Sequence, residues 1–442
     1  DCACAIANAD FGLHSMLATR IGDAELGLEE SSSVALARIR QLSAHEVGHT
    51  LGLAHNFAAS TYADRASVMD YPAPRIQVTK DKQFDFSEAY GVGVGDWDRF
   101  CIRAMYSSLG DNPTERLNEL VRESIDKGWI YLSDPDARPA SASDPRGNLW
   151  DDGTDPINSL GHAIEVRELG LSNFDDSVLL PGETAGDLRR YFAPLYFHHR
   201  YQVDAVVKFI GGVKYAYSLA GDADAETVDV PPSEQERAVL MLLKTLEPSV
   251  LAVEPSTARK LVPAGASASA SAWSIELPQG RTQPVFDPLA IVETAAEITL
   301  AGMLNPQRLG RLAIQSTRDE SHPGIALVLQ PLKRHALELL QSQASVGETL
   351  TARRIFAVIV SSGLEAADDS DARQDVRAAI REWLGALSSS MQAYTKAHPS
   401  DHDAEIALIR QRIDQFLDRP DLTYPATPVP SPPPGSPIGA GP

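Results

Sequence analysis

Residues 45–55 read HEVGHTLGLAH and contain three of the 11 histidines in this 442-residue chain, at positions 45, 49 and 55. Uniform scatter would place about 0.3 histidines in a window of this length, so the cluster requires a chemical explanation. Four residues advance an α-helix by about 400°, so the imidazoles of His45 and His49 project side by side and one metal ion can bridge them. The spacing therefore predicts two metal ligands on one face of a helix.

The rest of the window predicts a metal site with one open coordination position. Gly52 allows the backbone to reverse after the helix without a Cβ clash, so that His55 returns as a third ligand. Glu46 lies about 100° round the helix from His45, an offset that suits a proton acceptor for a metal-bound water better than a metal ligand. Zn²⁺ held by three protein ligands lowers the pKa of its bound water from 15.7 to about 7 and polarises a carbonyl oxygen. These residues predict zinc-assisted amide hydrolysis, with Glu46 passing the water's proton to the leaving amine.

A helix is predicted over residues 33–51, with Ser33 as its N-cap. Gly52 is expected to end this helix, because glycine adopts positive φ without strain. Residues at i, i+3, i+4 and i+7 are expected to form its buried stripe, namely Ala44, Val47, Gly48 and Leu51.

The pattern HExxHxxGxxH in residues 45–55 resembles the zinc signature of the metzincin metallopeptidases. Residues 67–71 read SVMDY and match the second mark of that family, a turn whose methionine, here Met69, forms an apolar floor beneath the metal. In some branches a tyrosine two places after the methionine binds the metal or the oxyanion, and Tyr71 matches that position, although a packing role for Tyr71 stays open. The resemblance implies a zinc-dependent endopeptidase that acts on proteins or peptides.

A finer resemblance concerns the residues around these motifs. Asn56 follows the third histidine, where the best-known metzincin branches have Glu, Asp, Ser or Pro. The run from His45 together with SVMDY is similar to a bacterial group of large zinc-dependent metzincins that includes the protease A subunit of an Ecx-type AB5 toxin. Residues 197–212 (FHHRYQVDAVVKFIGG) and 432–439 (PPPGSPIG) also resemble that group. This resemblance implies export to the periplasm, cell surface or medium, although no export signal is visible in these residues.

A metzincin catalytic domain normally places a twisted sheet of about five strands before its zinc helix, and the edge strand binds the peptide substrate. Only 44 residues precede His45 here, and they carry few strand signals. We therefore expect that sheet to lie outside this sequence. Two alternatives to a peptidase stay open, namely a zinc-stabilised helical scaffold without turnover and a hydrolase of a non-peptide amide, which would use the same water chemistry.

The fold class expected for the whole chain is mainly α. Residues 1–110 are assigned to the zinc-binding catalytic segment with its helix and methionine turn, and residues 111–156 to a loop-rich connection. Residues 157–418 are predicted to form a helical region, and nine prolines in residues 419–442 predict a flexible tail. Within the helical region, helices are predicted over residues 157–171, 184–210, 233–246, 288–304, 331–342, 349–360, 372–387 and 403–417.

The composition is that of a globular protein, with 43% hydrophobic and 22% charged residues. The formal net charge of −21 would repel phosphate backbones, which argues against a nucleic-acid partner. No apolar run approaches the roughly 18 residues of a membrane-spanning helix. Three cysteines are too few for a disulfide framework.

Other candidate ligands have simpler explanations. His198 and His199 lie among aromatic residues and are interpreted as hydrogen-bonded structural histidines. Asp151, Asp152 and Asp155 lack the twelve-position calcium-loop pattern and are interpreted as an acidic turn that caps the next helix.

Overall fold

The computed structural model describes residues 24–180, 182–218, 226–263, 277–342, 345–398 and 402–419. Helices make up most of this part of the chain, so the prediction of a mainly α fold is confirmed. Apart from Arg419, the predicted Pro-rich tail lies outside the described residues, as do residues 1–23 of the predicted catalytic segment. The described strands form two antiparallel pairs, β1 (Gln77–Val78) with β2 (Phe84–Asp85) and β3 (Val213–Lys214) with β4 (Val228–Asp229).

The described helices fall into three groups along the chain. The first group is α2 (Ala24–Thr50), η1 (Ala59–Thr61), α3 (Asp96–Tyr106), α4 (Pro113–Asp126) and α5 (Asp134–Ala137). The second is α6 (Pro156–Ser172), η2 (Asp176–Val178), η3 (Ala185–Asp187), α7 (Leu188–Tyr196), α8 (Arg200–Val207), α9 (Pro232–Lys244), α10 (Pro248–Leu251) and α11 (Pro255–Lys260). The third is α12 (Pro288–Met303), α13 (Pro306–Arg318), α14 (Ala326–Gln341), α15 (Val346–Asp368), α16 (Gln374–Ala397) and α17 (Asp403–Asp418).

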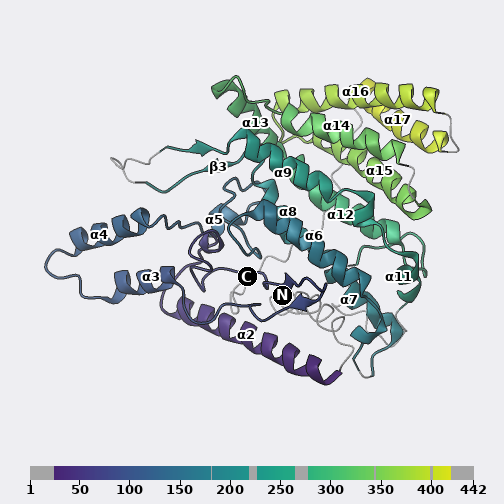
Figure 1. Cartoon of the computed structure of the whole chain (residues 1–442). Coiled ribbons are helices and arrows are strands. Elements are labelled where there is room, and N and C mark those ends of the chain that lie inside the picture. The colour runs from purple at the N-terminus through teal and green to yellow at the C-terminus, as the bar shows by residue number, and fades with distance from the viewer. Residues whose placement is uncertain are drawn as a thin grey trace.

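The helices stack in layers from α2 at one end of the molecule to α16 and α17 at the other (Figure 1). Helices α6, α8, α9 and α12 lie between these ends, α12 packs against both α8 and α15, and α16 packs against α15 and α17. One hydrophobic core joins these layers to the segment that follows α2, since buried Ile76, Phe84 and Phe86 belong to the same cluster as Leu160 of α6. The domain boundaries placed at residues 110 and 156 stay predictions.

Helix α2 begins at Ala24, nine residues before the predicted start, and ends at Thr50. Ser33 therefore lies inside the helix, and its prediction as the N-cap is wrong. Gly52 follows the helix end with φ +85°, as expected of the residue that lets the backbone reverse.

The predicted buried stripe of α2 is wrong for two of its four members, because 56% of Val47 and 39% of Leu51 are exposed. The buried side is instead that of His45 and Gly48, since the loop that carries Met69 packs against it. The buried face also carries the polar Gln41, whereas Val47 and Leu51 on the exposed face fit an apolar repeat, so the apolar spacing alone favoured the wrong face.

Two predicted helix boundaries in the C-terminal region are also corrected. The helix predicted over residues 184–210 consists of η3, α7 and α8, because a turn separates Tyr196 from Arg200. The helix predicted over residues 288–304 ends at Met303, and the side chain of Asn305 then accepts hydrogen bonds from the backbone N–H groups of Gln307 and Arg308 and so caps the start of α13. Helix α13 was not predicted.

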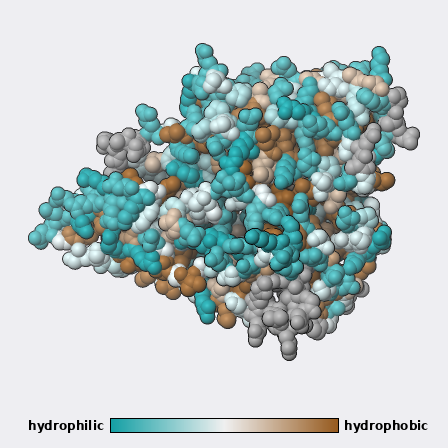
Figure 2. Space-filling model, in the orientation of Figure 1, coloured by the Kyte–Doolittle hydropathy of each residue, from teal (hydrophilic) through white to brown (hydrophobic). Residues whose placement is uncertain are grey.

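One face of the molecule is mainly polar. Figure 2 shows hydrophilic residues over most of the face in view, with hydrophobic residues in smaller groups between them. None of the described helices is long and apolar enough to cross a membrane.

Candidate metal centre

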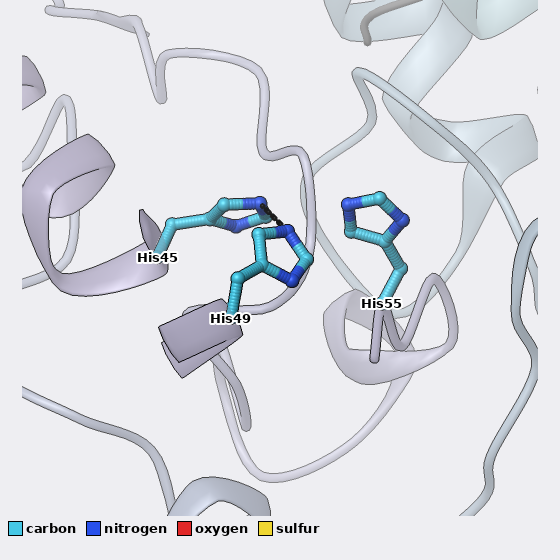
Figure 3. Close-up of side chains that lie close together, drawn as sticks. All are labelled: His45, His49 and His55. Atoms are coloured by element: carbon cyan, nitrogen blue, oxygen red, sulfur yellow. Dashed lines mark hydrogen bonds between the residues drawn. The ribbon is translucent and has the colours of Figure 1, made fainter. Parts of the chain in front are cut away.

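The structure brings His45, His49 and His55 together at the C-terminal end of α2 and in the turn that follows it (Figure 3). One ring nitrogen from each histidine lies within 4.8 Å of the others. The Nε2 atoms of His45 and His49 are 3.0 Å apart, and their ring centroids are 4.7 Å apart. The ring of His55 faces both, with centroid distances of 5.3 Å and 4.8 Å.

The outer nitrogen of each ring faces a hydrogen-bond acceptor. Nδ1 of His45 lies 2.7 Å from the carbonyl oxygen of Val68, and Nδ1 of His49 lies 3.0 Å from that of Leu53. These contacts assign the ring proton to Nδ1, which leaves the Nε2 lone pairs to converge at one point. Within the described part of the chain, Nε2 of His55 is buried and has no hydrogen-bond partner.

This arrangement fits a metal ion. Two imidazole lone pairs at 3.0 Å repel each other, and a buried nitrogen without a partner is costly, so a cation at the convergence point relieves both effects. Three neutral imidazole nitrogens are a donor set that suits Zn²⁺ and leaves a coordination position for a further ligand.

The electrostatics keep His45 in its metal-binding form. Burial lowers the pKa of His45 from 6.5 to about 4, and the nearby charges of His49, His55 and Arg38 lower it further. The hydrogen bond to Val68 acts in the opposite direction and raises this pKa. At neutral pH the imidazole of His45 is therefore uncharged, which is the form that donates a lone pair to a metal.

The reversal at Gly52 brings His55 back to the histidine pair. The backbone N–H of Gly52 donates to His49 O at 2.9 Å, and that of Leu53 donates to Gly48 O at 3.0 Å, so the last helical carbonyls are satisfied as the chain turns. The φ of +85° at Gly52 lies in the left-handed region that favours glycine. Gly52 thus occupies the turn for which it was predicted.

Met69 lies fully buried directly beside α2. Its sulfur is so close to Gly48 that a Cβ at that position would lie 2.3 Å from the Sδ atom. The side chain packs with Leu53 and Val68 in a small separate cluster. Asp98 fixes this turn by accepting a hydrogen bond from the backbone N–H of Val68 at 2.9 Å. Met69 is thus placed against the helix that carries the first two histidines.

Asn56 ties the turn after His55 to a distant segment. Its side-chain Nδ2 donates to Ile130 O and to the Tyr62 hydroxyl, each at 2.9 Å, and its Oδ1 accepts from the backbone N–H of Leu132 at 3.3 Å. The side chain is fully buried. Asn56 therefore holds the third histidine's loop in place rather than contributing to the metal site.

Tyr71 borders the histidine cluster. Its ring centroid lies 5.3 Å from that of His45 and 4.9 Å from that of His55. The opposite side of the ring stacks on Trp150 at 5.2 Å, with an interplanar angle of 29°. This position is compatible with a packing role for Tyr71, through the contact with Trp150. It is equally compatible with binding of a metal or an oxyanion, because the ring borders the three histidines.

Glu46 follows His45 on α2 and is partly buried. Its Oε1 atom is inaccessible to solvent and has no hydrogen-bond partner among the described residues. An unpaired carboxylate oxygen in such surroundings is available to bind a proton or a water molecule.

Two residues that the sequence did not reveal belong to the centre. Nδ1 of His55 is 2.8 Å from the Oδ2 of Asp134, whose other oxygen pairs with Arg138. Burial raises the pKa of Asp134, but the contacts with His55 and Arg138 outweigh it and hold this pKa well below its usual range. Trp150 is the second such residue. Both lie in a stretch interpreted as loop or connection, where Ser133 forms a capping box at the start of α5.

The other candidate ligands take structural roles. His199 is buried, but its Nδ1 has no hydrogen-bond partner among the described residues, so the expected hydrogen bonding is not found at that atom. Asp155 caps α6 by accepting hydrogen bonds from two backbone N–H groups, as predicted. Asp151 accepts from the Ser60 hydroxyl and Asp152 pairs with arginines, so neither caps the helix. His45, His49 and His55 form the one metal-binding group found among the described residues.

A search of curated proteins and a search of solved structures found no match to this chain. A family model described as Met-zincin matches residues 27–344, which include the three histidines, Met69, Tyr71 and most of the middle helices. The finer likeness to a toxin A subunit is not part of this match and stays a prediction. Because the model spans well over half of the sequence, the chain belongs to the Met-zincin family of metzincin metallopeptidases.

Proposed function

We propose that this protein is a zinc-dependent endopeptidase in which His45, His49 and His55 hold the metal and Glu46 acts as general base and then general acid. The convergence of three imidazole nitrogens, one of them buried without a partner, is the observation that carries the proposal. Membership of the Met-zincin family supports it.

The metal, when bound, supplies a Lewis acid that activates a water molecule and polarises the substrate carbonyl. The unpaired Oε1 atom of Glu46 would accept a proton from a water molecule as its oxygen adds to the carbonyl carbon, and would return that proton to the amine nitrogen as the C–N bond breaks. The carbonyl oxygens of Val68 and Leu53 hold His45 and His49 in the tautomer that keeps Nε2 free for the metal.

Tyr71 is proposed to donate its hydroxyl hydrogen to the negative charge that develops on the substrate carbonyl oxygen. The support is its position, with its ring 5.3 Å from the ring of His45 and 4.9 Å from that of His55. Trp150 keeps the ring oriented through the stacking contact.

The experiment that tests this function compares wild type with Glu46→Gln, both loaded with zinc, on a random peptide library read by mass spectrometry. We expect wild type to cleave peptides, and Glu46→Gln to lose cleavage by several orders of magnitude while it keeps one zinc per chain. Equal behaviour of the two proteins would favour the zinc-stabilised scaffold. Intact peptides together with hydrolysis of other amides would favour the non-peptide hydrolase.

Export from a bacterial cell is a separate proposal that rests only on the resemblance stated for residues 45–71, 197–212 and 432–439. Fractionation of cells that express the complete gene product tests it, with the protein expected outside the cytoplasm.

A further inference from the structure

Arg38 lies on the same face of α2 as His45, seven residues before it. Its guanidinium carbon is 5.8 Å from the centroid of the Trp150 ring and 5.4 Å from that of Tyr90. One guanidinium nitrogen donates a hydrogen bond to the Oε1 of Gln41. The side chain is partly buried, so these contacts hold its positive charge in a defined place.

Within the part of the chain that the structure describes, Arg38 has no carboxylate partner at ion-pair distance. Other partly buried arginines near the site do have one, since Arg75 pairs with Asp152 at 2.6 Å and Arg138 pairs with Asp134. Arg38 lies near enough to His45 for its charge to lower the pKa of that imidazole. The position therefore offers a positive charge to a ligand.

Trp150 connects Arg38 with the metal centre. Its ring contacts both the Arg38 guanidinium and the Tyr71 ring, and the Tyr71 ring borders that of His45. Trp150 has a φ of +61°, which a bulky side chain rarely adopts, and its backbone N–H donates to Tyr71 O at 2.7 Å. Trp150, which contacts both Arg38 and Tyr71, therefore has a strained backbone conformation. Such strain is common at functional sites.

From Arg38 to His45 the helix axis advances by about 10 Å, which is the span of about three residues of an extended peptide. The stacked rings of Trp150 and Tyr71 link the two ends of this span, since Trp150 contacts Arg38 and Tyr71 contacts His45. The guanidinium group carries five N–H donors in a plane, and the contact with Gln41 uses a nitrogen on one side only. Paired donors of this kind bind a carboxylate through two parallel hydrogen bonds.

We infer that Arg38 anchors a carboxylate-binding subsite, and that the protein selects peptides with a carboxylate two to three residues from the bond that is cleaved. The inference rests on the proposed peptidase function and names its substrate class. The carboxylate comes either from a Glu or Asp side chain or from the free C-terminus of the peptide, and both use the same contact.

The test uses a series of fluorogenic peptides on one neutral scaffold, with Glu or Gln placed in turn at each of six positions. Each peptide is made with a free and with an amidated C-terminus. We expect kcat/KM to be about tenfold higher for Glu than for Gln at one position, or for the free over the amidated end. The first result identifies an acidic side chain as the ligand, and the second identifies the chain end.

Three variants assign the preference to Arg38. Arg38→Gln is expected to reduce the Glu to Gln ratio to about one, and Arg38→Glu to favour Lys at the same position. Arg40→Gln is the matched control, because it removes the same charge from the same helix about 200° away and is exposed. The ratio within one variant is the readout, since a general disturbance of Trp150 would lower both rates together.

Each outcome of these measurements decides the question. No preference in wild type overturns the inference, and so does a preference that survives Arg38→Gln or is lost in Arg40→Gln. If wild type cleaves none of the peptides, the proposed function fails, and binding of the same labelled peptides to the zinc-loaded protein is measured by fluorescence anisotropy instead. Tighter binding of Glu peptides that Arg38→Gln abolishes supports the subsite, and equal binding overturns it.

Discussion

Replacement of Asp134 by asparagine should weaken zinc binding although Asp134 does not touch the metal. Its Oδ2 lies 2.8 Å from Nδ1 of His55, so the carboxylate orients the ring and increases electron density on Nε2. Loss of such an outer partner typically lowers metal affinity 10- to 100-fold, or by about 1.4 to 2.7 kcal/mol. Because 40% of the Asp134 side chain is exposed, we expect a value near the lower end, about tenfold.

The assay is competition for zinc between the protein and a chromophoric chelator at pH 7.5. Asn is close to Asp in volume and can still accept a hydrogen bond from His55, so Asp134→Asn isolates the effect of charge. Asp96→Asn is the control, because it removes a carboxylate that is 59% exposed and pairs only with Arg99. Cobalt absorption spectra of the same proteins report whether the ligand geometry changes.

Wild-type zinc affinity in Asp134→Asn would refute the assigned role of the carboxylate. A similar loss in Asp96→Asn would show that the overall charge of the protein, and not the contact with His55, determines the affinity.

Three further predictions concern packing, catalysis and pH. Gly48→Ala should lower the free energy of unfolding, measured by urea titration, by about 1 to 3 kcal/mol, because the new Cβ would lie 2.3 Å from Met69 Sδ. This clash is expected to outweigh the higher helix propensity of Ala. An increase in stability would contradict the packing of Met69 against Gly48. Tyr71→Phe should lower kcat about 100-fold with unchanged zinc content, since the ring stays while the hydroxyl is lost, and unchanged kcat would leave Tyr71 a packing residue. Burial and the neighbouring Glu293 and Glu365 raise the pKa of Glu297 to about 7, so its contribution to stability is present below pH 4.5 and lost as pH rises through 7. Glu297→Gln should therefore increase the free energy of unfolding at pH 8 by roughly 1 kcal/mol and leave it unchanged at pH 4. Differential scanning calorimetry can check this as a higher melting temperature at pH 8 only.

The convergence of the three histidines could be predicted from the sequence because their geometry is local. His45 and His49 are brought together by helical periodicity alone, and Gly52 permits the reversal that returns His55. Helix existence was also predictable over residues such as 157–171, where α6 was found, since the apolar period is long and regular.

The side of α2 that becomes buried could not be predicted. Val47 fits the apolar period but is exposed, whereas Gly48 is buried because the Met69 sulfur needs the space that a side chain would fill. Which of two possible faces is covered depends on the path of the loop after the helix, and no local pattern contains that path.

The same limit explains why the sequence revealed the histidines but not the groups that surround them. Asp134 is 79 residues from His55, and Trp150 is 79 residues from Tyr71, so both contacts depend on how a long intervening segment folds back. The segment between α5 and α6 has irregular backbone, as its many turn-forming residues predict, whereas Asp134 lies in the short helix α5. That composition does not indicate which side chains reach the histidine cluster. A loop held by Asn56 and by the hydrogen bond between Trp150 and Tyr71 is fixed in place without regular secondary structure. A segment rich in turn-forming residues should therefore not be treated as a mere linker when the chain also carries a local metal-binding motif. Such a segment can supply residues that orient the metal-binding side chains and border the substrate.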